Sequence, residues 1–238
     1  MRTVMVGLLA CVLAATTGCQ MLGLEKAGGG DVLELGNLAE SKSKTNAVPM
    51  AEGPVAVDGK LADPAWADAL ALGDFVRGPD RPAFKTRVLV TYDKDNLYVA
   101  VVNEEPHTGD LVANATQRDG QVWSDDCVEV YVDAWNSKDG DYYGFFVNPK
   151  NVVYDRRPGG EEGWSGEWNS GTCVIDGKAW VAELAVPFKT MGIQAKKGHK
   201  LGLMVARNRK PAGGAYVTLV PCNGEAKDTT RYPVLELK

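Results

Sequence analysis

The stretch Trp123-Ser-Asp-Asp-Cys-Val-Glu-Val-Tyr-Val-Asp133 is the part of this chain that best indicates the fold, because its second half alternates between two kinds of side chain. Successive residues of a β-strand point to opposite faces. One face would carry Val128, Val130 and Val132, and the other Glu129, Tyr131 and Asp133. A β-branched, apolar face is typical of a sheet packed on a core, so the stretch predicts a strand with one buried face and one polar, aromatic face.

The polar face also suggests a binding site. Trp123 has the same parity as Glu129, so a strand extended that far would present the indole and the carboxylate together. A flat apolar ring beside a hydrogen-bond acceptor suits a sugar, which offers C–H groups on its faces and hydroxyls on its edges. We expect Trp123 to be the stacking platform and Glu129 the hydroxyl acceptor, with Tyr131 and Arg207 as neighbours. The alternative is an ordinary strand with a solvated polar side.

Short strand-like runs separated by turn residues recur through the rest of the chain. The expected strands cover residues 85–92, 97–102, 127–133, 142–148, 152–155, 171–175, 180–186, 201–207, 216–220 and 234–237. The polar residues 93–96 between the first two predict a β-hairpin. Helix-like pieces are short, at 64–70 and 189–192. The pattern predicts an all-β protein, an antiparallel β-sandwich of the jelly-roll or immunoglobulin-like kind with short helical turns.

The N-terminal region differs in composition from the remainder. Residues 1–18 predict a signal peptide, because Arg2 precedes an apolar run over 4–15 that is too short to span a bilayer. Residues 19–49 are rich in Gly, Lys and Ser and predict a flexible tether. Residues 50–238 then form one domain, long enough to bury a full core.

Charge and cysteine content narrow the possible functions. The chain carries 26 Lys and Arg against 31 Asp and Glu, and this acidic balance without a long basic stripe argues against nucleic-acid binding. Cys127, Cys173 and Cys222 lie in the predicted domain, so one disulfide and one buried thiol are expected, with the pairing left open. Only two histidines accompany them, so a zinc site has little support.

The residues around Cys19 resemble a bacterial lipobox, since small residues directly precede the cysteine. This resemblance implies that Cys19 is lipidated. Gln20, in place of an Asp, resembles outer-membrane sorting and implies an outer-membrane or cell-surface lipoprotein. Thr16 stands where the motif usually has Leu, so a periplasmic or secreted protein with a plain signal is the alternative.

The ordered pieces of the domain resemble the family 9 carbohydrate-binding modules, β-sandwich domains attached to xylanases and found in many secreted bacterial proteins. The matching pieces are residues 57–66, 88–93, 96–100, 118–119, 123–133, 143–148, 167–168, 180–183, 186–188 and 202–207. They span nearly all of the domain. The resemblance implies non-catalytic carbohydrate binding at the cell envelope, in support of polysaccharide breakdown by glycoside hydrolases.

The resemblance also implies site residues. In sugar-binding members a tryptophan matching Trp123 and a carboxylate matching Glu129 contact the ligand, and a second tryptophan near the C-terminus completes a clamp. No tryptophan follows Trp180 in this chain. The rings that could replace it are those of Trp164, Trp168 and Tyr142. The family often binds calcium, which would suit the acidic loops at 93–95 and 139–141, although no ligand set is identified.

Several residues favour structural roles over binding or catalysis. Trp66 is expected to be a core plug, and Asp126, which shares the parity of the valines, to be buried or bonded to loop backbone. Glycoside hydrolysis needs two converging carboxylates. The candidates are Asp125, Asp126, Glu129 and Glu183, whose parity and spacing argue against such a pair.

Two further functions remain as alternatives to sugar binding. One is a scaffold or interaction lipoprotein that has lost the sugar site, consistent with the missing second tryptophan. The other is a haem-binding sandwich domain, for which the axial ligands would have to come from Met191, Met204, His107 and His199.

Overall fold

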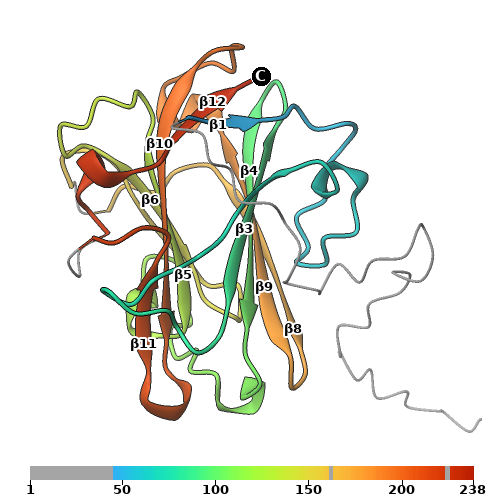
Figure 1. Ribbon diagram of the computed structural model, residues 1–238, viewed down its shortest axis with the longest axis vertical. Coiled ribbons are helices and arrows are strands. Elements are labelled where there is room, and N and C mark those ends of the chain that lie inside the picture. The colour runs from blue at the N-terminus through green and yellow to red at the C-terminus, as the bar shows by residue number, and fades with distance from the viewer. Residues whose placement is uncertain (1–44, 161–162, 223–225) are drawn as a thin grey trace, which may run out of the picture.

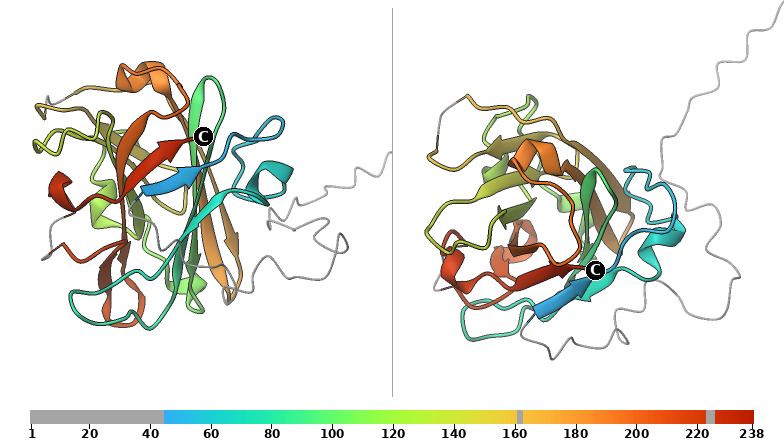
Figure 2. Two further views of the ribbon diagram at one scale, coloured as in Figure 1. Left: turned by 45° about the horizontal axis from the view of Figure 1, so that its top comes forward. Right: turned by 90° about the horizontal axis from the view of Figure 1, so that it is seen from above.

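The computed structural model describes residues 45–160, 163–222 and 226–238, which form two β-sheets packed face to face (Figure 1). Seen from above, the sheets are two layers around a common interior (Figure 2). Helical structure in the described residues is limited to short 3-10 turns. The predicted β-sandwich is confirmed.

The larger sheet has the strand order β1-β12-β10-β5-β6-β7, and β11 pairs with β10. Its strands are β1 (Thr45–Val48), β5 (Cys127–Asp133), β6 (Tyr143–Val147), β7 (Val153–Arg156), β10 (Lys200–Arg209), β11 (Ala215–Thr218) and β12 (Val234–Leu237). The smaller sheet has the order β2-β3-β4-β9-β8. Its strands are β2 (Leu70–Leu72), β3 (Thr86–Tyr92), β4 (Asn96–Glu104), β8 (Asn169–Ile175) and β9 (Ala179–Pro187).

The pairs between these strands are antiparallel, except for the parallel pair of β1 with β12. The 3-10 turns are η1 (Pro64–Trp66), η2 (Thr108–Asp110), η3 (Val122–Ser124), η4 (Phe188–Met191), η5 (Pro211–Gly213) and η6 (Thr229–Arg231). The predicted hairpin is the β3–β4 connection.

The main core lies between the sheets and includes the valine face of β5. A second, smaller cluster lies on the outer side of the smaller sheet, where Trp66 packs with Leu89 and Tyr98. Trp66 is buried there and serves as a plug, as expected. The sequence did not show that this plug belongs to a cluster separate from the main core.

The N-terminal boundary of the domain differs from the one expected. Residues 45–48 form β1, which pairs with β12 along its full length, and Val48 is completely buried. The domain therefore begins inside the segment that composition assigned to the tether. The rest of that segment, the signal at 1–18 and Cys19 lie outside the described residues.

The expected disulfide is not formed among the three cysteines considered for it. Cys127 and Cys222 carry free thiols and both are buried. With two of the three cysteines free, no disulfide can join any two of Cys127, Cys173 and Cys222. Within the described ranges, no helix has the length and apolar character needed to cross a bilayer.

Candidate functional site

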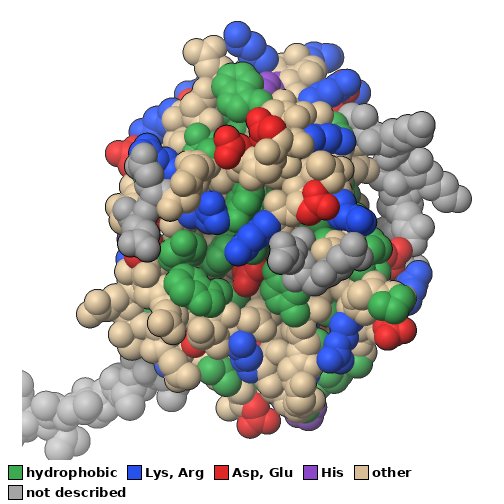
Figure 3. Space-filling model, turned by 90° about the vertical axis from the view of Figure 1, so that its left-hand side faces the viewer, with side chains coloured by type: hydrophobic (Ala, Val, Ile, Leu, Met, Phe, Trp, Pro, Cys, Tyr) green, Lys and Arg blue, Asp and Glu red, His purple; other side chains and the backbone are tan. Residues whose placement is uncertain are grey.

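The outer face of the larger sheet carries a row of side chains that crosses five strands. Residues paired across neighbouring strands point to the same face. The row consists of Tyr154 on β7, Phe146 on β6, Glu129 on β5, Ala206 on β10 and Thr218 on β11. The next row on the same face places Asn208 and Tyr216 beside Cys127. Figure 3 shows this side of the molecule, where hydrophobic side chains are exposed among Lys and Arg side chains.

Trp123 borders this row at the start of β5. It lies in η3 and not in the strand, and 41% of its surface is exposed. Its ring centroid is 4.9 Å from that of Tyr154, with the planes at 76°. Asn208 Nδ2 donates to the Trp123 carbonyl over 2.7 Å. The indole therefore lies on the same face of the sheet as Glu129, as expected, but the 3-10 turn η3 places it there and not an extension of β5.

Glu129 is held by hydroxyl groups on both sides. Its Oε2 accepts hydrogen bonds from Tyr131 over 2.6 Å and from Tyr216 over 2.8 Å. Burial raises the pKa of both tyrosines, and the Glu129 charge raises it further, so both hydroxyls remain protonated donors. Glu129 is only 4% exposed, so this face of β5 is covered and not solvated.

Tyr131 lies beneath the surface of this face. Its ring packs edge-on against Tyr142 at 5.3 Å and Phe146 at 5.2 Å. Because it is buried, it orients Glu129 and does not offer a ring to a ligand.

Arg207 does not join the other predicted site residues. The register of β10 sets Ala206 beside Glu129 and Arg207 beside Val128, so the guanidinium lies on the inner face. It is 1% exposed, and its Nη2 donates to Glu105 over 3.0 Å. Burial lowers its pKa to about 10. Its part in a surface site was wrongly expected, because strand parity alone does not fix the register between two strands.

None of the three rings proposed as a replacement clamp lies against Trp123. Trp168 is 7% exposed and donates from Nε1 to Asp155 over 2.7 Å. Tyr142 is buried beneath the Arg156 guanidinium, and Trp164 packs on Tyr143. The ring that does meet Trp123 is that of Tyr154.

The sequence alone did not identify three polar or aromatic residues of this face: Tyr154, Asn208 and Tyr216. Alternation within each strand indicates which residues of that strand share a face. Only the order of the sheet, in which β6 and β7 lie on one side of β5 and β10 and β11 on the other, places these residues near Trp123. Part of the outer face is also covered, since Tyr232 from the β11–β12 connection lies directly over Gly202. The accessible part of the face is the part near Trp123.

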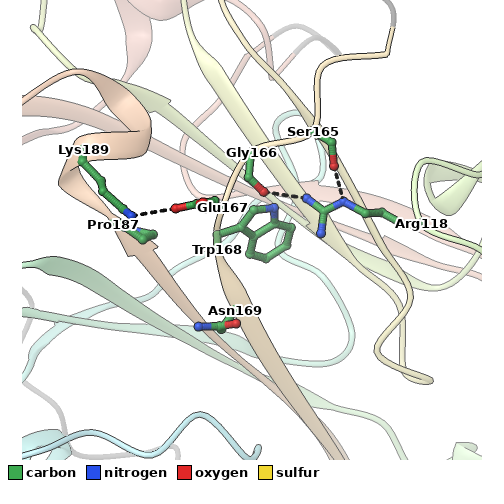
Figure 4. Close-up of a pocket in the computed structure, with 8 residues that line it drawn as sticks. All are labelled: Arg118, Ser165, Gly166, Glu167, Trp168, Asn169, Pro187 and Lys189. Carbon is green, nitrogen blue, oxygen red and sulfur yellow. Dashed lines mark hydrogen bonds and ion pairs between the residues drawn. The ribbon is translucent and has the colours of Figure 1, made fainter.

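A second candidate is an open hollow of about 640 Å³ beside β8 (Figure 4). Its charged groups are already paired. Arg118 donates to Ser165 Oγ over 2.6 Å and to the Gly166 carbonyl over 2.9 Å, and Lys189 contacts Glu167 at 2.6 Å. Trp168 shows little of its ring there, so the hollow lacks the exposed platform that Trp123 provides.

The other carboxylates considered for catalysis hold loop backbone. Asp126 is fully buried and accepts from the amides of Val112 and Lys210 over 2.7 and 2.9 Å, which confirms its expected structural role. Asp125 accepts from two further amides. Glu183 accepts from three amides in residues 58–61, and burial raises its pKa although these bonds oppose the shift.

The acidic loops do not fit a calcium ion. Asp93 Oδ1 accepts from two turn amides and its Oδ2 from the Tyr98 hydroxyl, while Asp139 accepts from the Asp141 amide. Across the ranges that the structure describes, no three His, Cys, Asp or Glu side chains are grouped so as to hold a metal.

The proposed haem ligands are not brought together. Met191 and Met204 are buried in the core. His199 lies just before the first residue of β10. His107 lies near the other end of β10, because Glu105, two residues before it, binds Arg209, the last residue of that strand. A strand of this length spans roughly 30 Å, so the two histidines lie far apart.

Comparison with known proteins identifies related domains. The family model described as "Carbohydrate family 9 binding domain-like" matches residues 57–238. No curated protein matches the chain.

Three solved structures have the same fold, each at 14% sequence identity. A protein from Bacteroides uniformis aligns with a TM-score of 0.65, covering 82% of this chain and 99% of its own. A family 9 carbohydrate-binding module from Caldicellulosiruptor kristjanssonii, solved with glucose, aligns with a TM-score of 0.60 and covers 81% and 96%. A module from the same organism, solved with cellotriose, gives 0.61, 81% and 94%.

Proposed function

Since this chain belongs to the carbohydrate family 9 binding domain-like family, we propose that it binds carbohydrate without catalysis, at the face formed by Trp123, Tyr154 and Glu129. The observation that supports this most is the exposed indole of Trp123, held beside a second ring on the face that carries Glu129. Modules of this fold have been solved with glucose and with cellotriose.

The face offers both kinds of contact that a pyranose needs. The indole can stack on the C–H face of a sugar, and Tyr154 meets the indole edge-on and limits its movement. Asn208 and Tyr216 are half-buried and can exchange hydrogen bonds with sugar hydroxyls. Glu129 sets the direction of the Tyr216 hydroxyl and contributes to the face through it.

The arrangement supports binding in preference to hydrolysis. Asp125, Asp126 and Glu183 are engaged by backbone amides, so they hold loops in place. Glu129 is bonded to two tyrosine hydroxyls. Hydrolysis requires a second carboxylate across the scissile bond, and Glu129 has none beside it in its row of the sheet.

Calorimetric titration of the purified protein with glucose, cellotriose and xylotriose tests the proposal. Trp123→Ala should weaken binding by about 0.5–1.5 kcal/mol from the lost stacking contact, or roughly two- to twelvefold in affinity. Trp123→Phe keeps an aromatic face and should retain most of the affinity. Because the exposed indole contributes little to the core, both variants should fold, and circular dichroism checks this.

The alternative outcome favours the scaffold function. The limited exposure of Glu129 and the cover over Gly202 are the observations on its side. A folded protein that gives no heat with any of these sugars, and that keeps its other interactions in Trp123→Ala, would contradict the sugar site.

We also propose that the protein is exported and anchored through lipidated Cys19 at the outer membrane or cell surface, where it supports polysaccharide breakdown. The basic, apolar and small-residue order of residues 1–19 supports this. Metabolic labelling with a radioactive fatty acid, with Cys19→Ser as the matched variant, tests it. Label that persists in the variant, or is absent from the natural protein, would contradict the anchor.

A further inference from the structure

A second exposed indole lies at the other end of β5. Trp135 is 64% exposed, more than any other large hydrophobic side chain in the described parts of the chain. The seven residues of β5 separate it from Trp123, a distance of roughly 20 Å along the strand. At the top of Figure 3, where the loop after β5 and the loop before β10 lie, hydrophobic, histidine and Lys or Arg side chains are exposed together.

The loop that carries Trp135 is braced against β5. The Asp133 carboxylate accepts from Ser137 N over 3.0 Å, from Ser137 Oγ over 3.3 Å and from Lys138 N over 2.9 Å. Asn136 and Lys138 adopt φ angles of 49° and 58°, in the left-handed region that is unfavourable for residues with a side chain. Such a conformation persists where surrounding bonds enforce it, and it is frequent at binding sites.

A second ring supports the indole from the side. The His199 ring lies 5.9 Å from that of Trp135, at an angle of 71° between the planes. His199 Nε2 is itself hydrogen-bonded to the Ala134 carbonyl over 2.8 Å. A single exposed hydrophobic side chain is ordinary on a protein surface. This one differs because hydrogen bonds hold its loop and the His199 ring contacts its indole, and such ordering lowers the entropy cost of binding.

The side chains of the Trp135 loop and of the nearby ends of β10 and β12 are polar and mainly basic. Lys200 and Lys238 contact Glu236 at 3.8 and 3.5 Å. Lys138 and the lysines of the 196–199 turn are exposed. An exposed ring with lysine donors and the Glu236 carboxylate on the nearby ends of β10 and β12 offers a sugar a stacking face and partners for its hydroxyls, which suits it better than an extended hydrophobic partner.

We propose that Trp135 is a second carbohydrate platform, which stacks on a neutral pyranose unit of the same class of polysaccharide that binds at Trp123. This inference rests on the proposed function and extends it. With a platform at each end of β5, the domain would hold one long chain at two points or hold two chains together. Binding at two points raises the avidity for a polymer well above the affinity for a short oligosaccharide.

The test compares Trp135→Ala, Trp123→Ala and the double variant. Calorimetry with cellotriose and with xylotriose should resolve two sites for one of these sugars on the natural protein, and each single variant should weaken one site by roughly two- to twelvefold. The double variant should weaken both sites. Retention on insoluble cellulose or xylan should fall at least tenfold in either single variant. Trp135→Phe should retain most of the affinity of both sites, and unfolding curves of all variants check that the fold is kept.

The outcomes separate the two proposals. Unchanged affinities and retention in Trp135→Ala, with binding weakened in Trp123→Ala, would overturn the second platform and leave the proposed function standing. The reverse result would leave Trp135 as the binding residue and overturn the Trp123 site. A folded natural protein that binds neither sugar overturns both. Loss of binding to anionic phospholipid vesicles in Trp135→Ala, without a change in sugar binding, would instead make this surface a membrane contact.

Discussion

The Glu129 carboxylate accepts a hydrogen bond from the Tyr216 hydroxyl over 2.8 Å, although β10 separates their strands. Ala206, the neighbour of Glu129 on β10, carries only a methyl group and leaves the Tyr216 side chain room to reach across. Tyr131 donates to the same oxygen from within β5. These bonds join β5 to β11 across β10, beneath the surface that Trp123 borders, and the carboxylate orients the hydroxyl group of Tyr216 in the proposed site.

Tyr216→Phe should reduce both stability and sugar affinity. The variant keeps the ring but removes one hydrogen bond to a buried carboxylate, which is worth about 1.5–3 kcal/mol. Urea unfolding measures the first effect and calorimetry with cellotriose the second. Tyr154→Phe is the matched control, because within the described residues the Tyr154 hydroxyl makes no hydrogen bond. Equal unfolding midpoints for the two variants would show that the bond to Glu129 contributes nothing.

Glu105→Gln should destabilise the protein strongly at neutral pH. The buried Glu105 carboxylate accepts from Arg209 Nε over 2.6 Å and from Arg207 Nη2 over 3.0 Å. Removing its charge leaves two guanidinium groups unpaired inside the sandwich, at a cost of about 3–5 kcal/mol. Urea unfolding at pH 7 measures this cost.

The same variant should change how stability depends on pH. Burial acts to raise the pKa of Glu105, but the hydrogen bonds from Arg209 and the His107 amide, with the charges of Arg209 and Arg207, outweigh it and hold the pKa below the ordinary 4.5. The folded state therefore binds fewer protons than the unfolded state, so this contribution is complete above 4.5 and is lost as the pH falls through the lowered pKa. The gap between wild type and Glu105→Gln should narrow below 4.5.

Glu167→Gln is the control for both measurements. Glu167 contacts Lys189 at 2.6 Å, but its side chain is 79% exposed, and exposed ion pairs contribute little. A Glu105→Gln protein as stable as this control would show that the buried pair is not a source of stability.

The sequence predicted most strands because their signals are local. The alternation in residues 127–133 and the polar turn at 93–96 correspond to β5 and to the β3–β4 hairpin. β1 could not be found this way, since a run of four residues becomes a strand only through its parallel partner β12. β2, with three residues, is shorter still and is defined only by its pairing with β3.

The site was only partly predictable, because its geometry depends on the register between strands. Parity within one strand correctly separated Glu129 from the valines. It could not tell that Arg207 lies one residue out of step with Glu129, nor that Tyr154 and Tyr216 share its face. It also could not show that the β11–β12 connection covers part of that face, since this depends on a contact between Tyr232 and Gly202.

A protein that starts at residue 50 should be less stable than one that starts at residue 45. The shorter chain lacks β1 and with it Val48, which is completely buried. Loss of one such side chain costs about 1.5–3 kcal/mol. It also exposes the edge of β12, which favours aggregation. Denaturant midpoints and light scattering measure the two effects, and equal midpoints would show that β1 adds no stability.

The Cys127 thiol should react with alkylating reagents only when the protein unfolds. Burial raises the pKa of Cys127 well above its usual value, and the charge of Glu129 and the hydrogen bond to it raise the pKa further. Since the thiolate is the reactive form, native protein at pH 8 should be almost inert at this position. Pulsed labelling with iodoacetamide across a urea series, followed by mass spectrometry of the peptide that contains Cys127, measures this. Labelling should rise together with the loss of the native circular dichroism signal. Rapid labelling in the absence of urea would mean that the face between Trp123 and Glu129 opens in the native state.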